Sequence, residues 1–517
     1  MVTPGVRLLP FGERGVLAEV GSLAEVLELH ARLAASRPAG ITDLVPAART
    51  VLVRVDPAVL STASARAWIG AEAADATAPD AGRDAAIVDL PVAYDGADLA
   101  DLAAQLGLSP EALAAAHSGA QWSVAFTGFA PGFGYLTSPD WPFDVPRLES
   151  PRPRVPAGAV GVAGEFTGAY PRDTPGGWRL IGTTSAALFD PDAVQPVLLA
   201  PGARVRFRPT RRATSLGVPR GRRPVEHAED APSFLVREPG LRATTQDRGR
   251  PGHAAEGIAE SGAADRAALR TANRLVGNAE DAVGVEVTMG GFRAVARTDL
   301  WFAVAGAWGP IRVGGRDVDP YAAHPWPADA ELHLDWFAHG ARGYLAVRGG
   351  LEVPTAVGSG SADTLAGLGP EPLRAGEVVR VGADVAGPVP AEDLHPWGPP
   401  RDDAIDIELA PGPRADWFAP ESVALLFESV WTVSNEADRV GIRLDGPELV
   451  RTRAGELPSE GMVPGALQVP PSGRPVVLGP DGPVTGGYPV VAVVADRSRD
   501  LLAQARPGTL LRFRHAR

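Results

Sequence analysis

The sequence predicts a mainly β protein with α+β parts, built on duplicated β-barrels. The first observation is a motif that occurs twice: VPAGAVGV starts at Val155 and VPGALQV starts at Val463. Similar turns and strands follow each copy, PGGWRLIG and PGARVRF in the first half, TGGYPVVAV and PGTLLRF in the second. Pro and Gly that open runs of β-branched and aromatic residues indicate alternating turns and strands.

The chain of 517 residues is too long for one hydrophobic core. We predict five segments: an N-terminal α/β domain over 1–86, a β-barrel over 87–210, a linker over 211–232, and a second half in two parts, 233–400 and 401–517. A turn-rich stretch over 75–86 closes the first domain.

Local patterns predict the elements of these domains. In the first domain, VLAEV and TVLVRVD are strand-like, whereas residues 23–35 and 61–75 are alanine-rich and amphipathic, as in helices. We expect Ser109 to cap the N-terminus of a helix in the second domain. A further helix is predicted over residues 266–278, and Asp265 directly before it is a candidate cap.

Composition excludes several classes of function. A net charge of −13 argues against binding of nucleic acid or anionic membranes. The N-terminus lacks an apolar signal core, and no apolar run approaches the roughly 18 residues that span a bilayer, so a cytoplasmic protein is expected. Cysteine is absent and the nine histidines are dispersed, so no metal site is predicted.

All 49 basic residues are arginine, and the chain contains no lysine. A Schiff-base lysine, and with it pyridoxal-phosphate chemistry, is therefore excluded. Covalent attachment of biotin through a lysine is excluded too. A Walker-A phosphate loop requires its lysine and is also excluded.

Two motifs of the first half could carry chemistry. FTGFAPGFGYL (126–136) combines flexible glycines with planar rings that could hold a small flat substrate, but it equally fits a packed aromatic turn. Its candidate residues are Phe129, Pro131, Gly132 and Tyr135. GEFTGAYPRDTPGGW (164–178) places charge beside a glycine turn, or presents solvated loop charge. Its candidates are Glu165, Gly176 and Gly177.

Two further motifs lie in the second half. TTQDRGRPG contributes Asp247 and Arg248 ahead of two glycines. SEGMVPGALQVPPSG contributes Glu460 and Gln468, and EADRVG contributes Asp438 and Arg439, which we expect to pair with each other. The nearby turn mirrors the GGW turn of the first half through Thr485, Gly486, Gly487 and Tyr488.

These motifs resemble a known family. FTGFAPGFGYL and VPAGAVGVAGEFTGAYPRDTPGGW, with His117 ahead of them, resemble allophanate hydrolase subunit 1, also known as the B subunit of 5-oxoprolinase. TTQDRGRPG, SGAADRAALRTANRLVGN, EVTMGG, SEGMVPGALQVPP and TGGYP resemble subunit 2, which is the C subunit of 5-oxoprolinase. The resemblance covers nearly the whole chain and implies a cyclophilin-like β-barrel in each half behind an N-terminal α/β domain.

The resemblance implies three functions. The first is 5-oxoprolinase, in which the fused B and C parts act with a separate A subunit to open 5-oxoproline to glutamate at the expense of ATP. The second is a biotin-dependent carboxyltransferase acting on urea or a related amide, with biotin on a separate carrier protein. The third is a Kip-type pair that inhibits a histidine kinase by binding. We favour the first, and homo-oligomerisation stays open.

For the favoured reaction we expect the two barrels to face each other across one cleft. Opening an activated lactam requires a general base, oriented donors and exclusion of water. His117, Asp247 and Glu460 are the predicted acid–base residues. The remaining candidates, Arg248, Asp265 and Arg439 among them, are expected to contact substrate.

Overall fold

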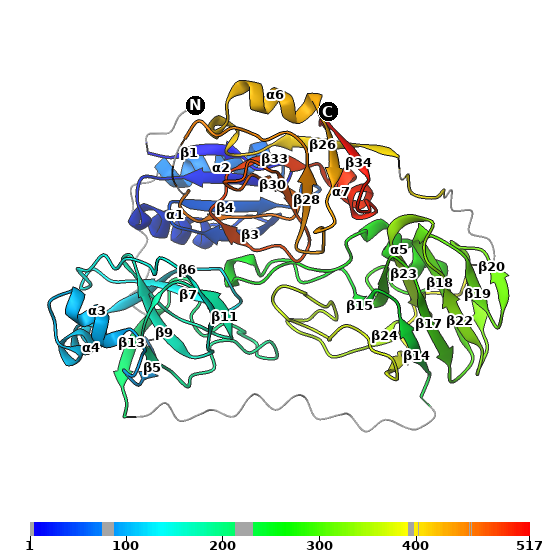
Figure 1. Cartoon of the computed structure of the whole chain (residues 1–517), viewed down its shortest axis with the longest axis horizontal. Helices are drawn as coiled ribbons and strands as arrows, with labels where there is room; N and C mark the ends of the chain where they lie inside the picture. The colour runs from blue at the N-terminus through cyan, green and yellow to red at the C-terminus, as the bar shows by residue number, and fades with distance from the viewer. Residues whose placement is uncertain are drawn as a thin grey trace.

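A computed structural model describes residues 5–74, 87–211, 231–390, 398–401, 403–453, 455 and 457–516. The predicted linker over 75–86 and nearly all of that over 211–232 lie outside these residues. In Figure 1 the chain forms three lobes: the two ends of the chain share the upper lobe, and two β-rich lobes lie below it.

The N-terminal unit is a four-stranded sheet with two helices packed against it. The sheet order is β1-β2-β4-β3 and every neighbouring pair is antiparallel. Its elements are β1 (Arg7–Pro10), β2 (Gly15–Glu19), α1 (Leu23–Ala35), β3 (Ile41–Pro46), β4 (Thr50–Val55) and α2 (Thr62–Ala74). Ser22 caps α1 by accepting a hydrogen bond from the Glu25 N–H. Both predicted strands and both predicted helices are present here.

The second unit is a seven-stranded sheet that curls into a barrel. Its order is β12-β9-β10-β7-β6-β13-β5, and an antiparallel bridge between Ala93 and Thr183 joins the two outer strands. Its strands are β5 (Ile87–Val92), β6 (Trp122–Thr127), β7 (Gly134–Thr137), β9 (Ala159–Ala163), β10 (Phe166–Ala169), β12 (Arg179–Thr183) and β13 (Arg204–Pro209). A small sheet joins β8 (Arg152–Val155) to β11 (Thr174–Gly176), and the helices are α3 (Leu99–Gln105) and α4 (Pro110–Gly119).

The third unit consists of two sheets, of seven and five strands, which share one core. The larger contains β14 (Ser233–Pro239), β17 (Phe292–Ala296), β19 (Ile311–Val313), β20 (Arg316–Val318), β22 (Glu331–Leu334), β24 (Leu351–Glu352) and β25 (Val378–Val381). The smaller contains β15 (Arg242–Gln246), β16 (Gly284–Thr288), β18 (Leu300–Trp308), β21 (His324–Trp326) and β23 (His339–Val347). Helix α5 (Arg266–Leu275) packs on β18 and β23, and short 3-10 turns lie at Ala254–Glu256 and, in the next unit, at Ala415–Trp417.

The fourth unit is a closed barrel with the order β26-β33-β30-β31-β28-β27-β34. Its strands are β26 (Ala404–Pro411), β27 (Val430–Val433), β28 (Gly441–Asp445), β30 (Ala466–Gln468), β31 (Val476–Leu478), β33 (Val490–Val494) and β34 (Leu510–His515). Two helices, α6 (Pro420–Glu428) and α7 (Asp496–Ala503), accompany it, and a small sheet joins β29 (Glu460–Gly461) to β32 (Thr485–Gly486).

The two barrels have the same topology, which confirms the mainly β fold with one barrel in each half. When the strands of each barrel are numbered in chain order, their cyclic order around the barrel is the same in both. In each barrel the first strand pairs in parallel with the last, β5 with β13 and β26 with β34. Trp122 and Trp431 hold equivalent places, because each donates its indole N–H to the carbonyl five residues earlier, on His117 and Leu426.

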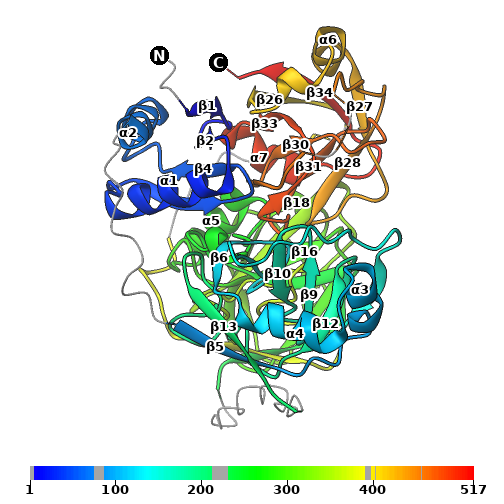
Figure 2. The ribbon, with the colours of Figure 1, turned by 90° about the vertical axis from the view of Figure 1, so that its left-hand side faces the viewer.

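The N-terminal unit packs on the second barrel, although about 330 residues separate them in the chain. Figure 2 shows β1, β2 and β4 beside β30 and β33. One apolar cluster joins the two units, with Phe11, Leu17 and Leu52 on one side and Met462 and Val493 on the other. The first and last parts of the chain thus form one body above the two other units.

Candidate functional site

One pocket lies where the first barrel, the third unit and the second barrel meet. The first barrel lines it with Phe129, Pro131 and Arg172. The third unit adds Gly257, Ala259, Asp363, Leu365 and Ala366, and the second barrel adds Asp481, Gly482, Pro483 and Val484. The two barrels therefore contribute to a single site, in agreement with the expected cleft between the halves.

The loop between β6 and β7 brings residues of the first barrel to this site. Its Phe129 has a φ of 66°, which is costly for a bulky residue, and the residue is 46% exposed. The Phe129 N–H points at the Thr485 hydroxyl at 3.3 Å. At the neighbouring Gly128 an added Cβ would lie 2.2 Å from that hydroxyl oxygen, so glycine is required where the two halves touch.

Two equivalent loops, one from each barrel, form hydrogen bonds with the same loop of the third unit. Arg172 lies between β10 and β12, and its guanidinium donates to the carbonyls of Leu365, at 2.7 Å, and Ala366. Asp481 lies between β31 and β33, and its carboxylate accepts the N–H and the hydroxyl of Thr364, each at 2.9 Å. Charges of opposite sign from the two barrels thus hold residues 364–366.

Two carboxyl groups line the pocket, those of Asp363 and Asp481, and both are buried. The Asp363 side chain is 3% exposed, and its Oδ1 accepts the N–H groups of Leu365 at 3.0 Å and Ala366 at 2.8 Å. Oδ2 is buried without a hydrogen-bond partner. Burial, reinforced by the nearby Asp481 carboxylate, raises the pKa of Asp363 to about 6, in the range useful for proton exchange.

Asp481 belongs to a buried charge network that fixes the second barrel against the third unit. Arg439 donates to both oxygens of Asp481 and, at 2.8 Å, to Glu286. Burial alone would raise the pKa of Asp481, but the Arg439 charge outweighs it and lowers this pKa. The expectation that Asp438 pairs with Arg439 is wrong: Asp438 accepts backbone N–H groups from its own turn, at Val440 and Gly441.

Asp247 organises a neighbouring loop rather than the pocket wall. It accepts hydrogen bonds from the hydroxyls of Ser359 and Ser361 and from the N–H groups of Gly249 and Gly360, at 2.5 to 2.8 Å. With four donors, the carboxylate is fully occupied. Arg248 points outward, with a side chain 72% exposed near Asp281, and does not reach the pocket.

His117 lies in the core of the first barrel and is fully buried. Nδ1 is 2.8 Å from the Tyr94 hydroxyl and Nε2 is 2.8 Å from the Thr167 hydroxyl. Burial lowers the pKa of His117 to about 3, so the ring is neutral near pH 7. Its catalytic role remains a prediction, because His117 does not line the pocket.

Glu460 lies where the second barrel meets the N-terminal unit, and it does not line the pocket either. Its carboxylate pairs with the buried Arg414, which also contacts Glu19 of β2 at 2.6 Å. Burial raises the pKa of Glu460 while Arg414 opposes that shift. The structure therefore does not bring His117, Asp247 and Glu460 together at the pocket between the halves.

The other predicted contact residues divide into three groups. Tyr135 stacks on Phe126 with ring centroids 4.4 Å apart, and Gly132 supports the same loop with a φ of 79°. Asp265 caps α5 through the Ala268 N–H, as predicted, and accepts a second hydrogen bond from Gln504. The remainder lie outside the lining, at the ends of short strands or in the loops beside them: Glu165, Gly176, Gly177, Gln468, Gly486, Gly487 and Tyr488.

Sequence reasoning missed Asp363 and Asp481 and left Arg172 as undifferentiated loop charge. A signal for two of them exists in the duplication. Pro171-Arg172 and Pro480-Asp481 both lie a few residues ahead of the GG-aromatic turn, so a comparison of the two repeats points to both segments, although aligning the turns places Arg172 against Gly482. Asp363 has no such counterpart, because it belongs to the third unit.

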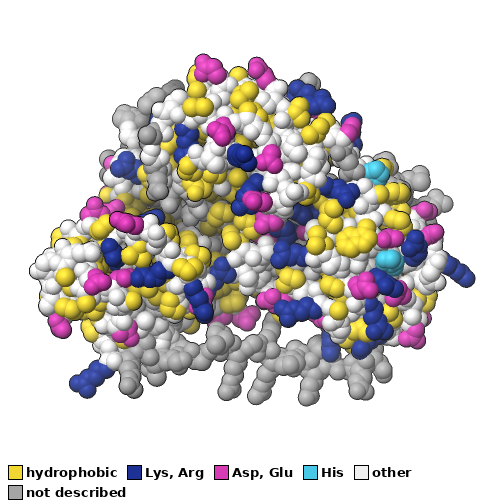
Figure 3. Space-filling view, viewed as in Figure 1, with side chains coloured by type: hydrophobic (Ala, Val, Ile, Leu, Met, Phe, Trp, Pro, Cys, Tyr) yellow, Lys and Arg dark blue, Asp and Glu magenta, His cyan; other side chains and the backbone are white. Residues whose placement is uncertain are grey.

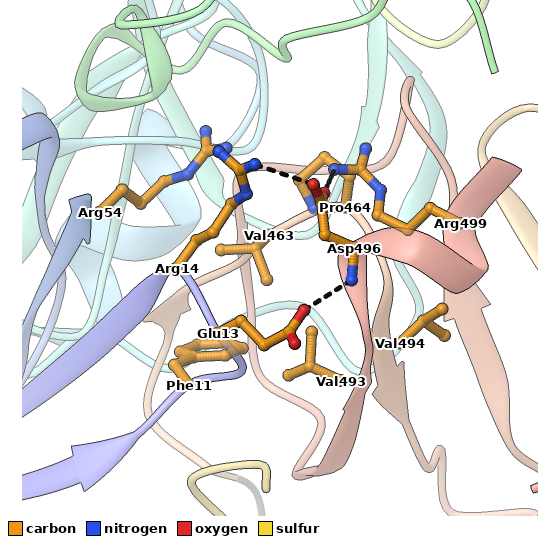
Figure 4. Close-up of a pocket in the computed structure, with 10 residues that line it drawn as sticks. All are labelled: Phe11, Glu13, Arg14, Arg54, Val463, Pro464, Val493, Val494, Asp496 and Arg499. Carbon is orange, nitrogen blue, oxygen red and sulfur yellow. Dashed lines mark hydrogen bonds and ion pairs between the residues drawn. The ribbon is translucent and has the colours of Figure 1, made fainter. Parts of the chain in front are cut away.

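A second pocket lies between the N-terminal unit and the second barrel (Figure 4). Arg14, Arg54 and Arg499 converge there on Asp496 and its surroundings. Arg14 contacts the Asp496 carboxylate at 2.8 Å, and Glu13 accepts the Asp496 N–H at the start of α7. Since acidic partners balance these cations, this region serves as a polar seam between the two units.

The outer surface carries mixed charge. On the face seen in Figure 3, acidic and basic side chains are interspersed, with no large field of one sign. Within the described ranges, no group of three His, Asp or Glu side chains is arranged to hold a metal ion. No helix of the described chain is long and apolar enough to cross a bilayer.

Family comparisons cover both halves. The family described as carboxyltransferase domain, subdomain C and D, matches residues 6–199, and the one described as subdomain A and B matches residues 256–515. The chain is 37% identical to the 5-oxoprolinase C subunit of Escherichia coli K12, over 53% of this chain and 88% of the relative. It is 50% identical to the 5-oxoprolinase B subunit of Escherichia coli O157:H7, over 24% of this chain and 57% of the relative.

Solved structures show the same fold over nearly the whole chain. The crystal structure of TTHA0988 matches with a TM-score of 0.84 and 38% identity, over 97% of this chain and 99% of that one. Urea amidolyase of Kluyveromyces lactis matches only in part, with a TM-score of 0.52 and 25% identity, over 57% of this chain and 19% of that one. The chain belongs to the carboxyltransferase-domain family that includes the B and C subunits of 5-oxoprolinase, and it joins a B-like and a C-like half in one polypeptide.

Proposed function

We propose that this protein is the fused B and C component of an ATP-dependent 5-oxoprolinase. Together with a separate A subunit it opens the lactam ring of 5-oxoproline to give glutamate. The names of its relatives support this reaction. The observation that carries the proposal is a pocket lined by both barrels and the third unit, since it gives a physical reason why B-like and C-like parts act together.

The side chains that line the pocket have the chemistry to contact a small, flat, polar substrate. Phe129 offers an exposed ring face at the rim, and the loop that carries it is held by tight contacts with the second half. Arg172 supplies positive charge at the same pocket, which suits the carboxylate of 5-oxoproline. Consumption of ATP and contact with an A subunit belong to this proposal because the family resemblance implies them.

The decisive measurement is glutamate release from 5-oxoproline by the purified chain, supplied with ATP and the A subunit. Replacing Gly128 by alanine drives a Cβ into Thr485 and should separate the halves at the pocket, so we expect a large loss of glutamate release. Adding Thr485→Gly to that variant removes the obstructing side chain and should restore activity in part. Gly119→Ala is the matched control, because an added Cβ there meets nothing within 4 Å.

A carboxyltransferase is the second candidate, favoured by the description of the matching family and by the partial likeness to urea carboxylase of Kluyveromyces lactis. Because the chain has no lysine, biotin would have to arrive on another protein. Carboxyl transfer from a biotinylated carrier to urea, without glutamate release from 5-oxoproline, would replace the first proposal with this one.

A further inference from the structure

A third pocket lies where the third unit meets the second barrel, beside helices α5 and α7, which lie close together (Figure 1). Its volume of about 530 Å³ is within the roughly 300–1,000 Å³ typical of sites for small organic molecules. Asp265, Ala268 and Gln504 line it and are buried, whereas Arg401 and Leu501 line it and are exposed. The pocket therefore opens to solvent and has a buried inner wall.

The carboxylate of Asp265 belongs to that inner wall. Oδ1 accepts the Ala268 N–H at 2.9 Å, and Oδ2 accepts the side-chain N–H of Gln504 at 2.7 Å. Both donors belong to residues that line the pocket, so the carboxylate lies between two parts of the lining. A carboxylate has about four acceptor positions, and the described chain fills two of them. The group can therefore accept further hydrogen bonds from a ligand.

No cation of the described chain forms a hydrogen bond with this carboxylate. Its two donors are uncharged, and the guanidinium of the adjacent Arg266 donates to Asp496 and Asp500 instead. Burial, reinforced by the carboxylates of Asp500 and Glu286, raises the pKa of Asp265 to about 6, so the group is mostly ionised at pH 7.5. A buried anion is costly unless a cation pairs with it. The inner wall therefore favours a positively charged group.

The rest of the lining combines apolar surface with charges that are already paired. Ala267 and Leu501 supply apolar contact near the opening. The other carboxylates of the lining, Asp406 and Asp500, are each paired with an arginine. Arg401, the cation of the lining, is exposed and contacts the carboxylate two residues further along the chain. A ligand would thus meet one unpaired negative charge at the inner wall and apolar side chains around it.

We propose that this pocket binds a small organic cation, made of a primary ammonium group and an apolar body. The ammonium group pairs with Asp265 and donates hydrogen bonds to its oxygens, and the apolar body packs against Ala267 and Leu501. Hydrogen bonds between charged partners are about twice as strong as those between neutral ones. The lining of this pocket has no residue in common with the pocket between the halves, so the inference does not depend on the proposed function.

The test is binding to the full chain at pH 7.5, measured by ligand-observed NMR titration. The probes are phenethylamine, which is protonated at this pH, and phenethyl alcohol, its neutral counterpart of similar shape. We expect the amine to bind at least about tenfold more tightly than the alcohol. Asp265→Asn keeps a side-chain oxygen that can cap α5 but removes the charge, so it should abolish this preference. Asp299→Asn is the control, because it removes an exposed carboxylate that also accepts a backbone N–H, from Ala328.

A second variant tests the cavity itself. Ala267 is exposed on α5 and lines the pocket, so Ala267→Trp should fold, fill the space and abolish measurable binding of the amine. Ala104→Trp, at an exposed alanine of α3, is the matched control and should bind the amine as the parent does.

The outcomes decide the assignment without reference to glutamate release. Loss of the preference in D265N, together with loss of binding in A267W, supports the cation site. Equal affinity of the two probes for the parent overturns it, as does an absence of measurable amine binding. An unchanged preference in D265N or undiminished binding in A267W overturns it too. Near-ultraviolet circular dichroism checks that D265N is folded, and where it is not, the comparison of probes and A267W decide.

Discussion

Arg172 and Asp481 occupy equivalent loops of the two barrels and hold the same loop of the third unit from opposite sides. Arg172 binds the carbonyls of Leu365 and Ala366, and Asp481 binds the N–H and hydroxyl of Thr364. The two barrels thus present similar loops that carry opposite charges, and both loops contact the same segment. The pocket wall is thereby assembled from all three units.

Removal of the Arg172 charge should loosen this wall. For Arg172→Gln we expect the free energy of unfolding to fall by about 1.5–3 kcal/mol, the usual contribution of a hydrogen bond to a charged group. Urea denaturation measures this change. Arg154→Gln is the control, because Arg154 pairs with Asp173 at the surface with 77% of its side chain exposed, and it should cost no more than about 1 kcal/mol. Equal losses of unfolding free energy in the two variants would contradict a role of Arg172 in holding the loop at Leu365 and Ala366.

Asp481→Asn should be more damaging, because it leaves Arg439 buried with one carboxylate partner instead of two. Breaking a buried pair from one side costs about 3–5 kcal/mol. The companion variant Asp445→Asn breaks the exposed pair with Arg474 and should leave the urea midpoint nearly unchanged. A D481N protein as stable as the parent would show that the network contributes little to stability.

The sequence made the duplicated barrels predictable, because the repeated motif falls on equivalent strands in both halves. Helix α1 was predicted with the bounds it has, and the caps at Ser109 and Asp265 were recognised from residue type and position. These features depend on neighbours a few residues away, which a linear pattern records.

The packing of the N-terminal unit on the last barrel was not predictable from pattern. The apolar pattern of the strand Thr50–Val55 predicts that it is buried, but it does not say which surface packs against it. Nothing in the sequence indicates that Met462 and Val493 lie in the same apolar cluster. The place of Asp363 in the pocket was not predictable for a related reason. Its loop sequence is polar and turn-rich, and its burial is imposed by loops of both barrels that lie far away in the chain.

His117→Leu tests whether this histidine is structural or catalytic. Leucine fills the equivalent place in the second barrel, at Leu426, so we expect the variant to fold. It leaves the hydroxyls of Tyr94 and Thr167 without the imidazole, at a cost of about 1–3 kcal/mol. Glutamate release with the A subunit should be retained. A folded variant with activity reduced by orders of magnitude would restore the predicted acid–base role.

The same variant predicts a pH dependence. The ordinary pKa of histidine is 6.5, and burial lowers that of His117 to about 3. Between these values the unfolded chain binds a proton that the native state does not, so the stability due to His117 is lost as the pH falls below about 6.5. The stability advantage of the parent over H117L should therefore be smaller at pH 5 than at pH 7. Tyr94→Phe retains the imidazole and should keep this pH dependence.

The apolar contact between the first and last units predicts that the two halves associate as separate chains. Residues 1–211 and 231–517, coexpressed, should purify together, since the cluster that contains Leu52 and Val493 would otherwise face water. Leu52→Asp should abolish copurification, because it places a charge in that cluster and against Gly461, where Leu52 packs closely. Val59→Asp, at a side chain 62% exposed, is the control and should copurify as the parent does. Copurification of L52D with undiminished yield would show that the other contacts between the halves, around Asp496, Arg172 and Thr485, are sufficient to hold them together.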